Sequence, residues 1–110
     1  MDPFVTLLKA LADETRLKIL HLLSANDLCV GALADRLGIS SAAVSQHLQV
    51  MRKAGIVKGE KRGYWTHYAV EKAALELLSE RFSKTASQVA DTKSACLRVF
   101  PMASNTEERR

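Results

Sequence analysis

The side chains best suited to recognition chemistry lie on a helix predicted over residues 41–54. At 100° per residue its apolar side chains share one face, while the opposite face carries small, hydroxyl, amide and cationic groups without a carboxylate. Hydroxyls and amides suit base edges, and cations suit phosphates. This pattern predicts a helix that contacts double-stranded DNA; a merely solvated polar face is the alternative. The predicted contact residues on and just before this helix are Ser40, Ser41, Ala42, Ser45, Gln46, Gln49 and Arg52.

A basic hairpin is predicted directly after this helix. Beyond Gly55 the hydrophobic period changes from 3.6 to 2, and residues 56–61 and 64–70 are expected to form strands around a turn at Arg62-Gly63. Lys61 and Arg62 at the turn could reach phosphate or the minor groove. Charges that only keep a turn soluble would look the same when isolated, but here they follow the polar helix.

Cys29 has a thiol, which suits reactive chemistry or metal binding rather than the recognition of DNA. It precedes a helix predicted over residues 30–37, where Ser, Thr or Asp usually caps the helix. The positive helix end favours the thiolate form. Cys29 could therefore hold a metal or metalloid or act in redox chemistry, alone or with Cys96. The alternative is that both cysteines are structural.

An enzyme that uses Cys29 as nucleophile is not expected. No acid–base partner and no phosphate-binding glycine loop accompanies the cysteine, and the five glycines are placed at turns. We therefore predict a binding protein without enzymatic activity.

The elements that must position these residues are five helices and the hairpin. Helices are expected over 3–12, 14–24, 30–37 and 41–54 and from residue 71, and Gly38 supplies a left-handed stop between the third and fourth helices. Two short helices with a tight connection, followed by a hairpin, predict a mainly α winged helix-turn-helix. We assign 1–83 to this domain, 84–100 to an extension of the last helix, and 101–110 to a flexible tail.

Composition agrees with a single small domain. The chain has 110 residues, 47% of them hydrophobic, and a net charge of +4. No apolar run approaches the ~18 residues of a membrane span, and two distant cysteines do not form a disulfide framework. We expect a cytoplasmic protein with no membrane partner.

Two apolar stripes predict a homodimer, because each needs burial. One lies on the first helix and one on the last. Their residues are Phe4, Leu7, Leu11, Leu75, Leu78 and Phe82.

The order of these pieces resembles the ArsR/SmtB family of bacterial repressors. The resemblance spans about residues 4–82 and rests on the segments ALADETRLKIL (10–20), DLCVGALA (27–34), SAAVSQHL (41–48) and GIV (55–57), with Arg62-Gly63 and Tyr68. It implies a homodimer that binds an inverted repeat of operator DNA and is released by an inducer. The family's base-contacting positions fall on Ser41, Ala42, Ser45 and Gln46, and Ala42 departs from the hydroxyl-bearing version.

The resemblance does not identify the inducer or a certain cofactor. The zinc-ligand positions of the last helix fall on Lys72, Ala74, Thr85 and Gln88, which cannot form that zinc site. Arsenite-type relatives carry Cys-Val-Cys where this chain has Cys29-Val30-Gly31. A winged helix that contacts another protein instead of DNA remains the alternative function.

Overall fold

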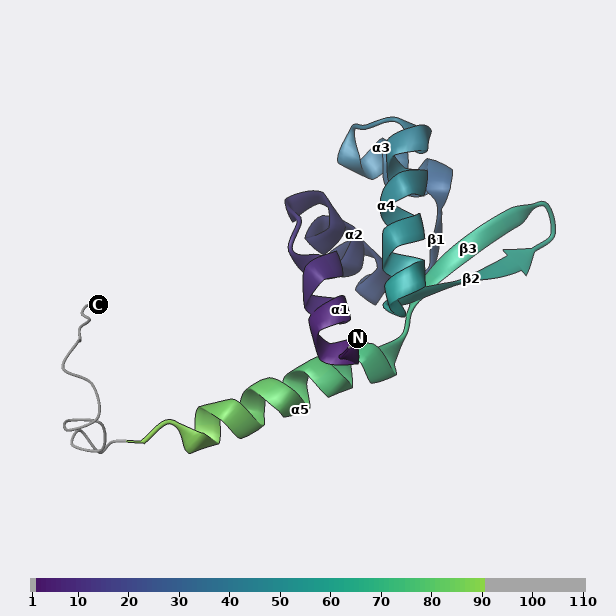
Figure 1. Ribbon diagram of the computed structural model, residues 1–110. Helices are drawn as coiled ribbons and strands as arrows, with labels where there is room; N and C mark the ends of the chain where they lie inside the picture. Colours follow the sequence, from purple (N-terminus) through teal and green to yellow (C-terminus); the bar gives the residue numbers. More distant parts are fainter. Residues whose placement is uncertain (1, 91–110) are drawn as a thin grey trace.

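The computed structural model describes residues 2–90, which form five helices and a three-stranded antiparallel sheet (Figure 1). The fold confirms the predicted winged helix-turn-helix, and most predicted boundaries lie within two residues of the observed ones. In chain order the elements are α1 (Pro3–Leu11), α2 (Glu14–Ala25), β1 (Leu28–Cys29), α3 (Val30–Leu37), α4 (Ser41–Ala54), β2 (Val57–Arg62), β3 (Trp65–Val70) and α5 (Lys72–Gln88).

Side-chain caps start three of the helices. The backbone N–H of Phe4 donates to the Asp2 carboxylate at 2.9 Å, that of Arg16 to Asp13 at 3.0 Å, and that of Ala43 to the Ser40 hydroxyl at 3.0 Å. Each bond satisfies one of the amides that a helix N-terminus leaves unpaired. α3 differs, because its N-cap is Cys29 and no side-chain bond caps it.

The core lies where α1 to α4 meet the inner end of the hairpin. Its most buried side chains are Ile19, Leu33, Val44, Leu48, Met51 and Ile56, each at most 1% exposed. Three of these come from α4, so the apolar face of that helix fixes its rotation and directs the opposite face outward. The predicted amphipathic arrangement of α4 is confirmed.

The tight connection between α3 and α4 follows from Gly38. This residue adopts φ +69°, a left-handed conformation that favours glycine. Its N–H and that of Ile39 both donate to the carbonyl of Ala34, at 2.8 and 3.3 Å. α3 therefore ends at Leu37, and α4 begins at Ser41 after a connection of three residues.

The sheet contains a strand that the sequence did not predict. The strand order is β1-β3-β2, and β1 pairs Leu28 with Tyr68 and Cys29 with His67. Two residues are too few for a period-2 pattern, so only the pairing in three dimensions reveals this strand. β1 ties the inner part of β3 to the helices, while the outer part of the hairpin projects away from the domain (Figure 1).

α5 leaves the domain as a projecting helix (Figure 1). The rings of Phe4 and Phe82 meet edge to face with centroids 5.2 Å apart, and the guanidinium of Arg81 lies 4.4 Å from the centre of the Phe4 ring. Residues 81–90 are all exposed.

The helix continues past the predicted boundary at 83 and ends at Gln88. The rest of the predicted 84–100 extension beyond residue 90, the 101–110 tail and Cys96 lie outside the described residues. None of the helices in the described part of the chain is long and apolar enough to cross a membrane.

Candidate nucleic-acid interface

The outward face of α4 is exposed at every position predicted to contact DNA. The inner residues Val44, Leu48 and Met51 are buried, and no carboxylate occurs anywhere in α4. The exposed positions are Ser40, Ser41, Ala42, Ser45, Gln46, Gln49 and Arg52. A face of this chemistry presents donors, acceptors and positive charge to DNA without repelling phosphates.

Hydrogen bonds within this face divide its residues into two kinds. The Ser40 hydroxyl accepts from the Ala43 amide, so its oxygen is used for capping while its proton can still be donated. Arg52 donates to the Gln49 side chain at 2.7 Å. Within residues 2–90, the side chains of Ser45 and Gln46 make no hydrogen bond, and both are ready to bond a base edge.

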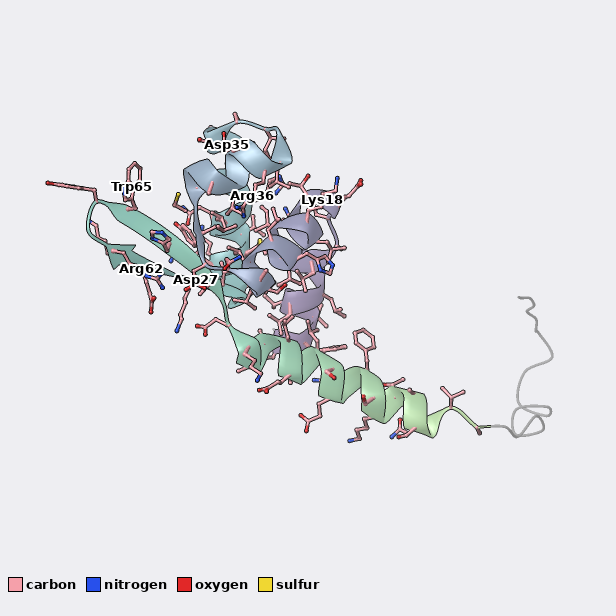
Figure 2. The ribbon with its side chains drawn as sticks, turned by 180° about the vertical axis from the view of Figure 1, so that it is seen from behind. Lys18, Asp27, Asp35, Arg36, Arg62 and Trp65 are labelled. Carbon is pink, nitrogen blue, oxygen red and sulfur yellow. The ribbon has the colours of Figure 1, made fainter. Side chains whose placement is uncertain are left out.

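Arg62 does not extend from the end of the hairpin as expected. Its Nη2 atom lies 2.7 Å from the carboxylate of Asp27, the neighbour labelled in Figure 2. The same atom lies 2.9 Å from the carboxylate of Glu60. Hydrogen bonds to Asp27 and then to Glu60 raise the pKa of the guanidinium above its ordinary value. The charge predicted to meet phosphate is thus already paired within the protomer, whereas Lys61 stays exposed without an ion pair in the described part of the chain.

The outermost side chains of the hairpin are aromatic. Arg62 pairs with Trp65, which leaves Gly63 and Tyr64 as the two turn residues. Tyr64 is 98% exposed and Trp65 64% exposed. The sequence predicted a strand at both residues, which is right for Trp65, the first residue of β3, and wrong for Tyr64, which lies in the turn. Neither was predicted as a candidate contact, and the position of Tyr64 next to Gly63 was the available signal.

Cys29 lines a hollow between the hairpin and the start of α4. The hollow has a volume of about 400 Å³, and its other walls include Ser41, Tyr64, Trp65 and Tyr68. Cys29 is a free, half-buried thiol. Its cross-strand neighbour is His67, and directly paired residues share one face of a sheet. The buried Nδ1 atom of His67 has no hydrogen-bond partner.

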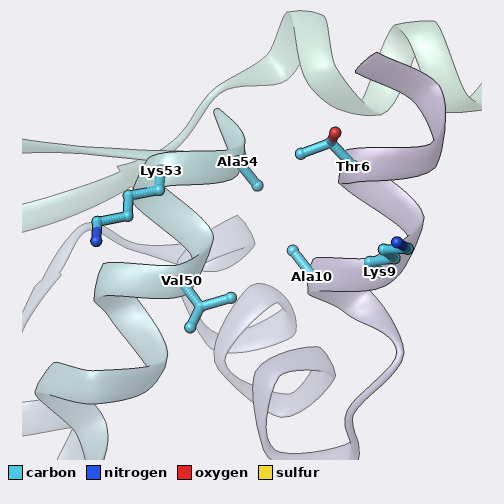
Figure 3. Close-up of a pocket in the computed structure, with 6 residues that line it drawn as sticks. All are labelled: Thr6, Lys9, Ala10, Val50, Lys53 and Ala54. Carbon is cyan, nitrogen blue, oxygen red and sulfur yellow. The ribbon is translucent and has the colours of Figure 1, made fainter. Parts of the chain in front are cut away.

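A second hollow, of about 370 Å³, lies between α1 and the C-terminal half of α4 (Figure 3). Its walls are mainly apolar, and the ammonium of Lys53 extends away from α1. The lining residues are Thr6, Lys9, Ala10, Val50, Lys53 and Ala54. None of them carries a thiol, imidazole or carboxylate, so this hollow offers no side-chain ligand of the types that hold soft metals.

The described residues do not by themselves form a metal site. Within residues 2–90, no three His, Cys, Asp or Glu side chains lie close enough together to hold a metal ion. Cys29 is the only thiol in this part of the chain, and Cys96 lies outside it. A three-thiolate site for a soft metal is therefore not built from these residues.

The residues predicted for a dimer interface differ in what they leave exposed. Leu7 and Leu78 are 3% and 8% exposed and are already packed in the core of the protomer. Leu11, Leu75 and Phe4 are half-buried against that core, and Phe82 is 53% exposed. The surface still available for a partner is therefore concentrated on the outer half of α5.

Comparisons with known proteins agree with this geometry. Residues 13–58, which run from the cap of α2 into β2, match the family described as "Bacterial regulatory protein, arsR family". The transcriptional activator HlyU of Vibrio cholerae is 45% identical over 78 residues, which cover 67% of this chain and 72% of HlyU. The chain belongs to the ArsR family. It is a DNA-binding transcriptional regulator.

Two further similar proteins show how far the likeness extends. The arsenical resistance operon repressor of Escherichia coli is 45% identical over 65 residues, which cover 58% of this chain and 56% of that protein. A homodimeric winged helix-turn-helix DNA-binding domain from Mycobacterium bovis superposes with a TM-score of 0.66 at 26% identity, and the match covers 78% of this chain and 81% of that one.

Proposed function

We propose that this ArsR-family regulator is a homodimeric repressor that binds an inverted-repeat operator and leaves it when an inducer binds. The observation that carries the proposal is the exposed, carboxylate-free face of α4 beside a projecting hairpin. α4 enters the major groove, where Ser45 and Gln46 bond base edges. The hairpin acts as the wing and lies over the flanking backbone and minor groove.

Dimerisation supplies the second recognition helix that an inverted repeat requires. Within residues 2–90 the outer half of α5 stays exposed: Phe82 is 53% exposed despite its contact with Phe4, and Val89, just after the helix end, is 75% exposed. A second copy would bury this surface and bring two recognition helices onto one face of the DNA. The homodimeric neighbour from Mycobacterium bovis supports this assembly. Phe4, Leu11, Leu75 and Phe82 are the proposed interface.

DNase I footprinting on DNA upstream of the protein's own gene tests this function. The expected result is protection of two half-sites whose centres lie about one helical turn, roughly 34–36 Å, apart. A single half-site, or protection that does not survive competition with random duplex, would contradict a homodimeric operator-binding repressor. If the protection does not survive competition, the alternative applies, in which the winged helix contacts a protein partner.

Because the repressor acts on operator DNA, we place it in the cytoplasm.

We also propose that the protein is not an enzyme. Cys29 is the only thiol among residues 2–90, yet in that part of the chain it has no hydrogen-bonded base, and the Nδ1 atom of His67 makes no hydrogen bond. A nucleophilic cysteine needs such a base or another activating group.

The position of Cys29 favours a thiophilic inducer, such as arsenite or a soft metal ion. The hollow beside Cys29 is walled by Ser41 of the recognition helix and by Tyr64 and Trp65 of the wing. A group bound at this thiol would therefore stand between the two elements that hold DNA. Cys96, or the cysteines of a second protomer, would have to supply the remaining thiolates. This class of inducer is supported by similar proteins named as an arsenical resistance operon repressor and as a cadmium resistance transcriptional regulatory protein homolog.

Release of DNA by arsenite and by cadmium, measured for the wild type, Cys29→Ser and Cys96→Ser, tests the inducer. Loss of release in Cys29→Ser is expected. If neither substitution changes release, the cysteines are structural and the inducer acts elsewhere.

A further inference from the structure

The wing ends in an aromatic pair rather than in a cation. Tyr64 is 98% exposed and its neighbour Trp65 64% exposed, although side chains of this size normally bury most of their surface. The only other strongly exposed aromatic ring among residues 2–90 is that of Phe82, on α5. Such exposure at the end of a projecting hairpin indicates a contact surface.

The local geometry holds this pair outward. Arg62 and Trp65 pair directly, and Gly63 adopts φ +65° at the first of the two turn positions, as the tight primed turns of hairpins require. β1 pairs with β3 only at His67 and Tyr68, so residues 61–66 project beyond the body of the sheet. In Figure 2 the Trp65 ring stands out from this projecting part.

The charges around the aromatic pair leave it free to approach DNA. The guanidinium of Arg62 pairs with both Asp27 and Glu60, so the carboxylate nearest to the turn already has a cationic partner. Lys61 remains exposed on the neighbouring strand, opposite Thr66. A phosphate contact beside an apolar group is the arrangement by which wedge side chains enter the minor groove.

We propose that Tyr64 is a wedge that enters the minor groove at the edge of each half-site, with Trp65 packed beside it, and bends the DNA there. The proposal rests on the proposed operator binding. Partly unstacking two neighbouring base pairs costs free energy, and this cost depends on the DNA sequence of that step. The wedge therefore favours flexible pyrimidine–purine steps at positions where the protein reads no base directly. Tyr64 thereby determines specificity through DNA shape.

The sequence supplies the probe for this contact, because Trp65 is the only tryptophan. Acrylamide quenching of its fluorescence is measured for the full-length reduced protein, free and bound to DNA upstream of its gene. The expected result is a loss of quenching on binding. Anisotropy of the labelled DNA reports binding independently, so tight binding with unchanged quenching would overturn the wedge and leave the operator function intact.

Substitutions at Tyr64 separate a wedge from a charge contact. Tyr64→Leu keeps an apolar wedge, and Tyr64→Lys replaces it with a cation; the exposure of this position makes both compatible with the fold. End-to-end energy transfer in doubly labelled DNA measures the bend. Leu is expected to retain the bend and Lys to lose it, while Tyr64→Ala should weaken operator binding about tenfold, or about 1.4 kcal/mol.

Exchange of the flanking pyrimidine–purine step for a stiff A-tract completes the test. It should weaken the wild type and leave Tyr64→Ala unaffected. An unchanged bend in Tyr64→Lys, or equal sensitivity of Tyr64→Ala to the flanking step, would overturn the proposal. Leu17→Ala removes an exposed apolar side chain from α2, away from the proposed DNA and dimer surfaces, and serves as the control for nonspecific loss of surface.

Discussion

Arg62 donates a 2.7 Å hydrogen bond to Asp27, and this ion pair ties the outer end of β2 to the residue before β1. The two residues are 35 positions apart in sequence. The bond turns the guanidinium back toward the body of the domain, and the aromatic residues of the turn become the outermost groups. The ion pair thus connects the wing to the segment that leads into β1, the strand that contains Cys29.

Removing both acids that pair with Arg62 should strengthen DNA binding. In Asp27→Asn combined with Glu60→Gln, the Arg62 guanidinium loses both of its carboxylate partners and becomes available to a phosphate. We expect tighter binding to operator and random DNA alike, and a plot of log K against log salt that is steeper by about one unit. Anisotropy titrations at several salt concentrations measure both quantities.

The companion substitution Arg62→Ala distinguishes anchoring from direct contact. Because the guanidinium is already paired, its loss should leave the salt slope unchanged. A slope that becomes shallower by about one unit would mean that Arg62 leaves Asp27 and contacts phosphate in the complex.

Gln46 should carry base discrimination. Its side chain is exposed on α4 without a hydrogen bond inside the described part of the protomer, and an amide can bond adenine through two atoms. Gln46→Ala should weaken operator binding by roughly 1–3 kcal/mol and relax one base position. Binding to random duplex should not change. Equal losses on both DNAs would assign Gln46 to the backbone instead.

Cys29→Ser should stabilise the fold. α3 starts without a side-chain cap, and serine is among the preferred capping residues. The expected gain is about 0.5–1 kcal/mol, seen as a rise in Tm of about 2–8 °C. Ser40→Ala, which removes an existing cap from α4, should shift the free energy of unfolding the other way by about 1 kcal/mol. A Tm for Cys29→Ser below the wild type would show that the thiol packs better than a hydroxyl caps.

Stability should fall in acid partly because of Asp13. The hydrogen bond from the Arg16 backbone N–H, aided by the Arg16 charge, holds the pKa of this carboxyl below its usual value of 3.8. Because the carboxyl has a lower pKa in the folded state than in the unfolded state, it stabilises the fold at pH values above its unfolded-state pKa. This contribution is lost as the pH falls below about 4 and passes through the folded-state pKa. Thermal unfolding between pH 7 and 3 should therefore show a steeper acid loss in the wild type than in Asp13→Asn, which keeps an accepting oxygen but no charge. Parallel curves would remove Asp13 from the account.

Much of the fold was predictable because its signals are local. The helix starts are indicated by Asp2, Asp13 and Ser40, and a helix end is indicated by Gly38. The periodicity of α4 separates its buried face from its exposed face. Each of these features depends on a few neighbouring residues, so the sequence alone indicates them.

The rest depends on pairings between distant parts of the chain. β1 is too short for a hydrophobic period and exists because Leu28 and Cys29 meet Tyr68 and His67. Likewise, the basic residues at the turn predicted an unpaired cation at Arg62. In the structure Arg62 pairs with the carboxylate of Asp27, 35 residues earlier in the chain. Burial of Leu7 and Leu78 within the protomer also follows from packing that an apolar stripe does not specify.

Binding of the reduced protein to DNA from just upstream of its own gene tests the central claim most directly. Fluorescence anisotropy at one fixed salt concentration, with unlabelled random duplex as competitor, separates specific from general affinity. The account predicts tight binding, with a specific-to-random ratio of roughly 10³ or more. Binding no stronger than that to random duplex would contradict an operator-specific repressor at this site.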